Sequence, residues 1–106
     1  MRIDIDFSIF TSAPSAEGVI SGKIELNALP RIGEVVSFLA SPNGHKFPAA
    51  SEFDPLLKVE NVTHQINSQL VMLQLQDVVL PNKTSVGEVT TFLEQGFGLF
   101  FDPVGE

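Results

Sequence analysis

The first ten residues alternate between apolar and polar side chains. Ile3, Ile5, Phe7 and Ile9 fall on one side of an extended chain, and the polar residues between them fall on the other. A period of two is the pattern of a β-strand with one buried face. The sequence therefore predicts a strand over residues 2–10 whose apolar side chains enter a core.

Two further strands are predicted before the first long irregular segment. Residues 19–29 alternate, with Gly22 interrupting the apolar face, and Pro30 ends the ladder because it has no N–H to donate. Residues 34–40 are apolar on both faces, which predicts a central or covered strand.

The segment 56–80 predicts a long β-hairpin that turns about the Asn-Ser pair at 67–68. Its apolar residues change parity between Val59 and Val62. One extra residue near positions 60–61 would keep both sets facing inward, which is the mark of a β-bulge. A bulge bends its strand, and bent strands let a small sheet close into a barrel.

A short helix is predicted over residues 86–95. Ser85 and Glu88 have the spacing of a capping box, and Gly96 stands where a helix commonly stops. These elements together predict a mainly β fold: a small, strongly bent barrel of about five strands with one short C-terminal helix. We expect residues 1–106 to form a single domain.

Composition and charge narrow the classes of function. The 106 residues include 13 acidic and 6 basic ones, a formal net charge of −7, and the basic residues form no cluster. Nucleic-acid binding draws its affinity from grouped Lys and Arg, so this charge disfavours a nucleic-acid partner. The absence of cysteine excludes disulfides and thiolate chemistry. No apolar run approaches the length of a membrane helix, so we expect a soluble, cytoplasmic protein without a membrane partner.

His64 is the first residue to test for chemistry, since the chain has only two histidines. A two-residue turn at 67–68 would place His64 opposite Val71, as a neutral side chain at the barrel rim. No nucleophile elbow, P-loop, dinucleotide fingerprint or HExxH motif occurs. We therefore expect no enzyme, no catalytic residue, no cofactor and no bound metal. The second alternative, after RNA binding, is a small hydrolase or metal-binding protein centred on His64.

The segment 41–55 is the longest irregular stretch and a candidate ligand loop, because long loops often carry function. A base could stack on a phenylalanine beside a lysine there, which keeps an RNA-binding function open as the first alternative. The candidate ligand residues of this loop are Asn43, His45, Lys46, Phe47 and Phe53.

The segment 97–101 places four large apolar side chains in five positions near the end of the chain. Three free phenylalanines would expose about 450–750 Å², whereas the largest apolar patch of a typical monomer is about 300–600 Å². Either the chain's own sheet or a neighbouring copy must cover them. Two residues on the outward face of the predicted hairpin also need cover. We predict a homo-oligomer, possibly a ring in form, joined by strand edges. The predicted interface residues are Leu70, Met72, Phe97, Leu99, Phe100 and Phe101.

Three stretches, "LPRIGEVVSF" at 29–38, "LKVENVTHQ" at 57–65 and "LVMLQLQD" at 70–77, resemble small barrel proteins of the SH3-like and Sm-like type. The resemblance implies ring formation and, for the Sm group, RNA binding. Asn43 and Gly44 match the turn that holds the base-binding Asn of the Sm signature. The Arg-Gly pair of its second half is absent, and the helix follows the barrel instead of preceding it. Some barrels of this type are encoded by phages, which would place the protein in a host-cell cytoplasm.

Overall fold

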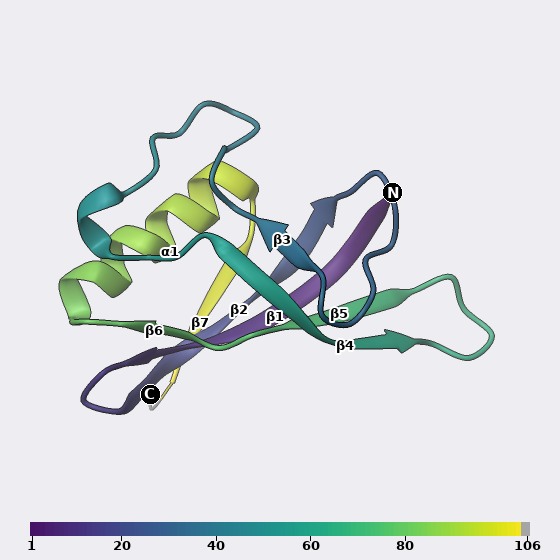
Figure 1. Cartoon of the computed structure of the whole chain (residues 1–106), viewed down its shortest axis with the longest axis horizontal. Helices are drawn as coiled ribbons and strands as arrows, with labels where there is room; N and C mark the ends of the chain where they lie inside the picture. The colour runs from purple at the N-terminus through teal and green to yellow at the C-terminus, as the bar shows by residue number, and fades with distance from the viewer. Residues whose placement is uncertain (105–106) are drawn as a thin grey trace.

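The computed structural model describes residues 1–104, which form a curved sheet and one α-helix (Figure 1). The elements in chain order are β1 (Arg2–Thr11), β2 (Ser15–Glu25), β3 (Val35–Ser37), the 3-10 turn η1 (Ala49–Ser51), β4 (Leu56–His64), β5 (Val71–Leu75), β6 (Val78–Leu80), α1 (Lys83–Phe97) and β7 (Phe100–Pro103). Strands make up 43% and helical residues 17% of the chain, which confirms a mainly β fold with one C-terminal helix.

The strand order in the sheet is β3-β4-β5-β1-β2-β7, and β6 pairs with β1 beyond the end of β5. The β1–β5 and β1–β6 pairs are parallel, and the other pairs are antiparallel. Over the described residues the sheet has seven strands where about five were predicted. The difference has two causes. The second arm of the hairpin breaks into β5 and β6, and the segment after α1, residues 99–103, which we call the tail, adds β7.

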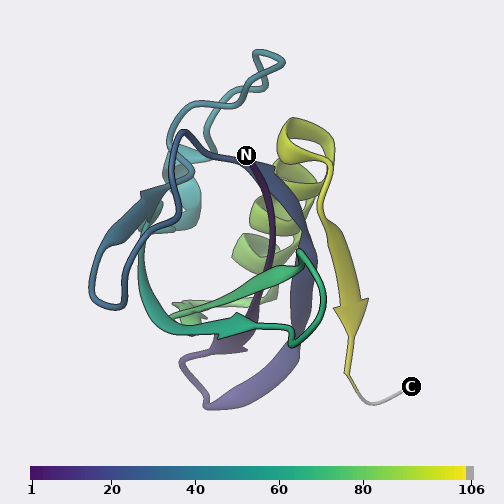
Figure 2. The ribbon, with the colours of Figure 1, turned by 90° about the vertical axis from the view of Figure 1, so that its right-hand side faces the viewer.

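The sheet curls strongly back toward itself, and α1 lies on its concave side (Figure 2). β3 and β7 are the two ends of the strand order and are not paired with each other, so the sheet is not a closed barrel. Val89 and Leu93 of α1 are fully buried in the core that the helix and the inner face of the sheet share.

The alternating pattern at the start of the chain predicts the burial of β1 correctly. Ile3, Ile5, Phe7 and Ile9 are all buried, and the residues between them are only half-buried or exposed. Since β1 pairs with β2 on one side and with β5 and β6 on the other, its inner face lies at the centre of the core.

The predicted β-bulge is confirmed: the register between β4 and β5 shifts between Val59 and Asn61. Beyond the bulge Val62 faces Leu73 and points inward, as Val59 does before it, whereas Ile66 in the hairpin loop is exposed. The predicted pairing of His64 with Val71 is also confirmed.

The prediction that residues 34–40 form a central or covered strand is wrong. β3 pairs only with β4 and lies at one end of the sheet. Val36 and Phe38 are buried, but Val35 and Leu39 on the opposite face are 55% and 56% exposed. The apolar pattern is real, yet within one copy of the chain only one face of this strand is covered.

The ends of α1 differ from those predicted. Its N-cap is Asn82, whose side chain accepts a hydrogen bond of 2.9 Å from the Ser85 N–H, and Ser85 lies inside the first turn. Its C-cap is Gly98 in the left-handed conformation, with the N–H bonded to the Glu94 carbonyl. Gly96 therefore does not stop the helix. Its lack of a side chain instead makes room for the loop of residues 41–55, because a Cβ added at Gly96 would lie 3.0 Å from Ser41 Oγ.

The tail docks on β2, which runs over Ser15–Glu25 instead of the predicted 19–29. Two glycines of β2 leave space for it. A Cβ at Gly18 would lie 2.6 Å from the Phe101 ring, and a Cβ at Gly22 would lie 2.8 Å from the Leu99 side chain. The glycine that interrupts the apolar face of this strand thus provides the seat for the closing segment.

Candidate functional site

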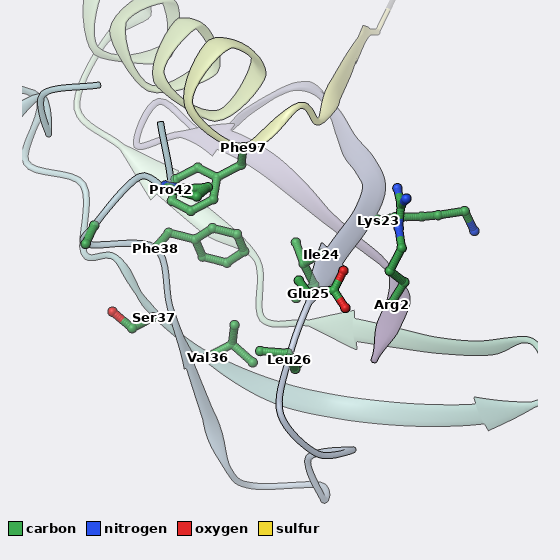
Figure 3. Close-up of a pocket in the computed structure, with 11 residues that line it drawn as sticks. Arg2, Lys23, Ile24, Glu25, Leu26, Val36, Ser37, Phe38, Pro42 and Phe97 are labelled. Carbon is green, nitrogen blue, oxygen red and sulfur yellow. The ribbon is translucent and has the colours of Figure 1, made fainter. Parts of the chain in front are cut away.

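A cavity of about 390 Å³ lies between the end of β2 and the free edge of β3 (Figure 3). We call this gap, between residues 22–26 and 35–38, the seam. Ile24 and Leu26 point into it from the β2 side, and Val36 and Phe38 point into it from the β3 side. Phe97 of α1 adds an apolar wall, with its ring centroid 5.2 Å from that of Phe38.

The β2 edge of the seam carries backbone groups without a strand partner among the described residues. Leu26 N donates to Met1 O, so Leu26 is hydrogen-bonded to the β1 side. In an antiparallel ladder every second residue is bonded to the partner strand, and the N–H and C=O of Lys23 and Glu25 therefore point away from β1. β7 covers this side of β2 only as far as Ser21. The edge of β2 is therefore half occupied, and its remaining part opens into the seam.

The β3 edge has the same property. Phe38 N donates to Pro55 O, so the N–H and C=O of Val35 and Ser37 turn away from β4. Within residues 1–104 no strand pairs with them. The seam is thus bounded on both sides by unpaired backbone, at the place where a further strand would join the two edges.

Positive charge collects at the outer mouth of the seam, where Arg2 and Lys23 point away from the apolar interior (Figure 3). Lys23 Nζ lies 2.9 Å from an Asp4 carboxylate oxygen, and the Met1 ammonium lies 3.1 Å from a Glu25 carboxylate oxygen. Arg2 forms no ion pair with any described residue. An acidic group at this mouth would therefore meet an uncompensated guanidinium, although the chain as a whole has a net charge of −7.

The candidate ligand loop is fastened to the end of α1 by its polar residues. Asn43 Nδ2 donates to the Gln95 carbonyl at 2.7 Å, and Ser41 Oγ donates to the Gly96 carbonyl at 2.8 Å. His45 is exposed, and its Nδ1 lies 2.8 Å from Asn43 Oδ1. Asn43 therefore holds the loop in place, and its amide is already engaged.

The two phenylalanines of this loop belong to the core. Phe53 is buried at 4% exposure, and Phe47 is half-buried against it with ring centroids 6.0 Å apart. Phe47 also packs edge-on against Phe92 of α1. Neither ring is presented beside the exposed Lys46 for stacking on a base.

The structure divides the predicted interface residues into two groups. Leu99 is 2% exposed, and Phe97 and Phe101 are half-buried against the core of their own chain. The other three are exposed, and two of these lie on the outer face of the sheet, which is the face turned away from α1. Phe100, Met72 and Leu70 are the exposed members, with Leu70 in the hairpin loop.

Three residues that the sequence analysis did not select share the outer face with Phe100. Val19 is a diagonal neighbour of Phe100 on β2, and Phe10 of β1 pairs with Val79 of β6. Val19 and Val79 are exposed and Phe10 is half-buried. Phe10 and Val19 stand at positions of the strand alternation that otherwise carry polar residues, which was the one available signal.

The outer edge of β7 is closed to strand pairing. Phe101 N–H points away from β2 and is already bonded to a Glu94 carboxylate oxygen at 3.2 Å, and Pro103 has no N–H to offer. Of the two ends of the sheet, the one formed by β7 is therefore protected, whereas the one formed by β3 is not.

His64 lies exposed at the end of β4, away from the seam. Among residues 1–104 no three His, Asp or Glu side chains come together in a way that could hold a metal ion. The described part of the chain also has no helix long and apolar enough to span a membrane.

Comparison of the chain with models of protein families, with curated proteins and with solved structures found no match.

Proposed function

We propose that the chain is a non-enzymatic binding module of the small-barrel type, SH3-like or Sm-like with one open seam, that assembles into a homo-oligomer. The strong curl of the sheet and the bulge in β4 support the barrel comparison, since both are devices by which a few strands wrap around a core. The surface that would join the copies is the outer patch, formed by Phe10, Val19, Val79 and Phe100.

The exposure of Phe100 carries this proposal. Its side chain is 68% exposed, whereas the side chains of the adjacent residues Leu99 and Phe101 pack against the core. A phenylalanine on a paired strand that is turned to water, with Val19 beside it, is the kind of apolar feature that marks a contact surface. Aromatic residues at the centre of an interface commonly contribute most of its affinity.

The outer patch is suited to packing of two faces against each other. A stable interface buries about 800 Å² on each partner, so the four apolar residues would form its centre. The polar residues beside them on the same face include Asp6, Ser8 and Ser21, which would also enter the contact. Pairing of two β7 edges is disfavoured because Glu94 and Pro103 close that edge. A two-fold axis through the patch would bury both copies of Phe100 at once.

Light scattering over a range of protein concentrations tests the proposal. We expect the wild-type mass to exceed the 11.5 kDa of one chain, and we expect Phe100→Ser to restore the single-chain mass with little change in stability. Ile66→Ser is the matched control, because Ile66 is also exposed but lies in the hairpin loop away from the patch. A wild-type mass of one chain at every concentration would end the proposal.

A further inference from the structure

We propose that the seam binds an extended segment of a partner protein by strand addition, and that the segment alternates apolar and acidic residues. The inserted strand would pair with β2 on one side and with β3 on the other, and would join the two edges of the curled sheet. The seam and the outer patch are different surfaces, so this inference does not depend on self-association.

The backbone of the seam is arranged for such a strand. Lys23 and Glu25 on one edge, and Val35 and Ser37 on the other, direct their N–H and C=O groups into the gap. The pairing pattern from β2 through β1, β5 and β4 makes β2 and β3 run in opposite directions. An added strand would therefore be antiparallel to one edge and parallel to the other, and both arrangements form regular hydrogen-bond ladders.

The two faces of the seam specify alternating side chains. On the inner face the cavity of about 390 Å³ is walled by Phe38, Phe97 and Leu26, and its size lies within the range of pockets that hold apolar groups. On the outer face the neighbours are Lys23, Glu25 and Arg2; Lys23 is paired with Asp4 and Glu25 with the Met1 ammonium, which leaves the guanidinium of Arg2 as the unpaired charge among the described residues. Because successive residues of a strand point to opposite faces, every second residue should be apolar and the residues between them acidic.

The contrast between the two ends of the sheet supports this assignment. Exposed edges are normally blocked by proline, by charge or by a covering element, and β7 has two of these in Pro103 and Glu94. β3 has none, since its sequence is Val35, Val36 and Ser37. An unblocked edge beside an apolar cavity can pair with an added strand. Such an edge carries a risk of aggregation, and its presence is explained if the edge is a binding site.

Peptide binding can be measured without labelling the protein, because the chain has no Trp and no Tyr. The probe is a six-residue peptide of alternating Leu and Asp with one added Trp, followed by Trp fluorescence. We expect saturable binding to the wild-type protein, and loss of binding when Lys replaces Asp in the peptide. Absence of saturable binding of the acidic peptide, or equal binding of the basic one, would overturn the proposal.

Ser37→Pro blocks the β3 edge from the protein side. The substitution removes an N–H that points into the seam and leaves the bonds of Val36 and Phe38 to β4 in place. Loss of one hydrogen bond weakens binding by about 2- to 13-fold, and the proline ring would add a steric block. Ser37→Ala is the control and should bind like wild type. Equal affinity of Ser37→Pro and Ser37→Ala would contradict pairing with β3.

A second probe leaves the protein unchanged, so its result does not depend on the folding of a variant. Peptides N-methylated at alternate amides lose the donors toward one edge, and each should bind at least about twofold more weakly than the parent. Undiminished binding would mean that side chains alone hold the peptide. Light scattering of Ser37→Pro completes the test: an unchanged particle mass is expected, whereas a reduced mass would identify a second copy as the occupant and overturn the assignment to a partner.

Discussion

Replacement of Gly18 by alanine tests how the tail is held on the sheet. A Cβ at this position would lie 2.5 Å from the Asp102 carbonyl oxygen and 2.6 Å from a carbon of the Phe101 ring. The nearest atom belongs to the backbone, so a change of rotamer cannot relieve the contact. Gly18→Ala should therefore push β7 away from β2.

The size of the effect follows from the contacts that β7 would lose. Val104 N donates to Glu17 O, so the next hydrogen-bonded pair along β7 is Val19 with Asp102. Breaking both hydrogen bonds of that pair costs about 1 kcal/mol each, and exposing the half-buried Phe101 costs about 1 kcal/mol more.

A smaller term opposes this loss. Alanine has less backbone freedom than glycine in the unfolded chain, which returns about 0.5–1 kcal/mol. The expected net decrease in the free energy of unfolding is about 2 kcal/mol, or about 8–16 °C in Tm. Such a decrease is a substantial part of the stability of about 5–15 kcal/mol typical of a small domain.

Denaturant unfolding followed by far-UV circular dichroism measures this change, since the chain lacks Trp and Tyr for fluorescence. The control is a double-mutant cycle with Phe101→Ala. Gly18→Ala should cost less in that background, because one of the two clashing groups is gone, although the Asp102 oxygen remains. Wild-type stability of Gly18→Ala would refute the docking of β7 on β2.

The two ends of α1 give the remaining predictions. Gly87→Ala should raise the free energy of unfolding by about 1 kcal/mol, because Gly87 has open space around it in the helix and alanine is the better helix former. Gly96→Ala should give none of that gain, since its Cβ would press on Ser41 at 3.0–3.2 Å; equal stabilisation of the two variants in denaturant unfolding would contradict the packing of this loop. Asn82→Ala should lower the free energy of unfolding by about 1 kcal/mol through loss of the N-cap, whereas Asn82→Asp should retain it. A larger loss in Ser85→Ala than in Asn82→Ala, measured in the same way, would instead place the cap at Ser85.

Local patterns in the sequence predicted those features that depend on near neighbours along the chain. The alternation of residues 2–10 gave the inner face of β1, and the change of parity after Val59 gave the bulge. The turn at 67–68 gave the pairing of His64 with Val71. Each of these is decided by side-chain period or by turn geometry, which act over a few residues.

Contacts between residues far apart in the sequence could not be predicted from such local patterns. No local signal shows that Phe47 packs against Phe92 of α1 and against Phe53 of its own loop. The seat of Leu99 and Phe101 on β2 depends on glycines about eighty residues earlier in the chain. The apolar composition of the tail required that something cover it, and only the fold shows that most of the cover comes from the same chain.

The error at residues 34–40 supports the inference about the seam. A strand with apolar residues on both faces is expected to be buried on both faces, because exposing valine and leucine side chains to water costs free energy. In the single chain Val36 and Phe38 are covered, whereas Val35 and Leu39 are not, and the edge between them is unpaired. The unpaired edge is the part of β3 that a strand added at the seam would cover, and that strand would make β3 an interior strand of the sheet. Val35 and Leu39 on the outer face would stay exposed beside it.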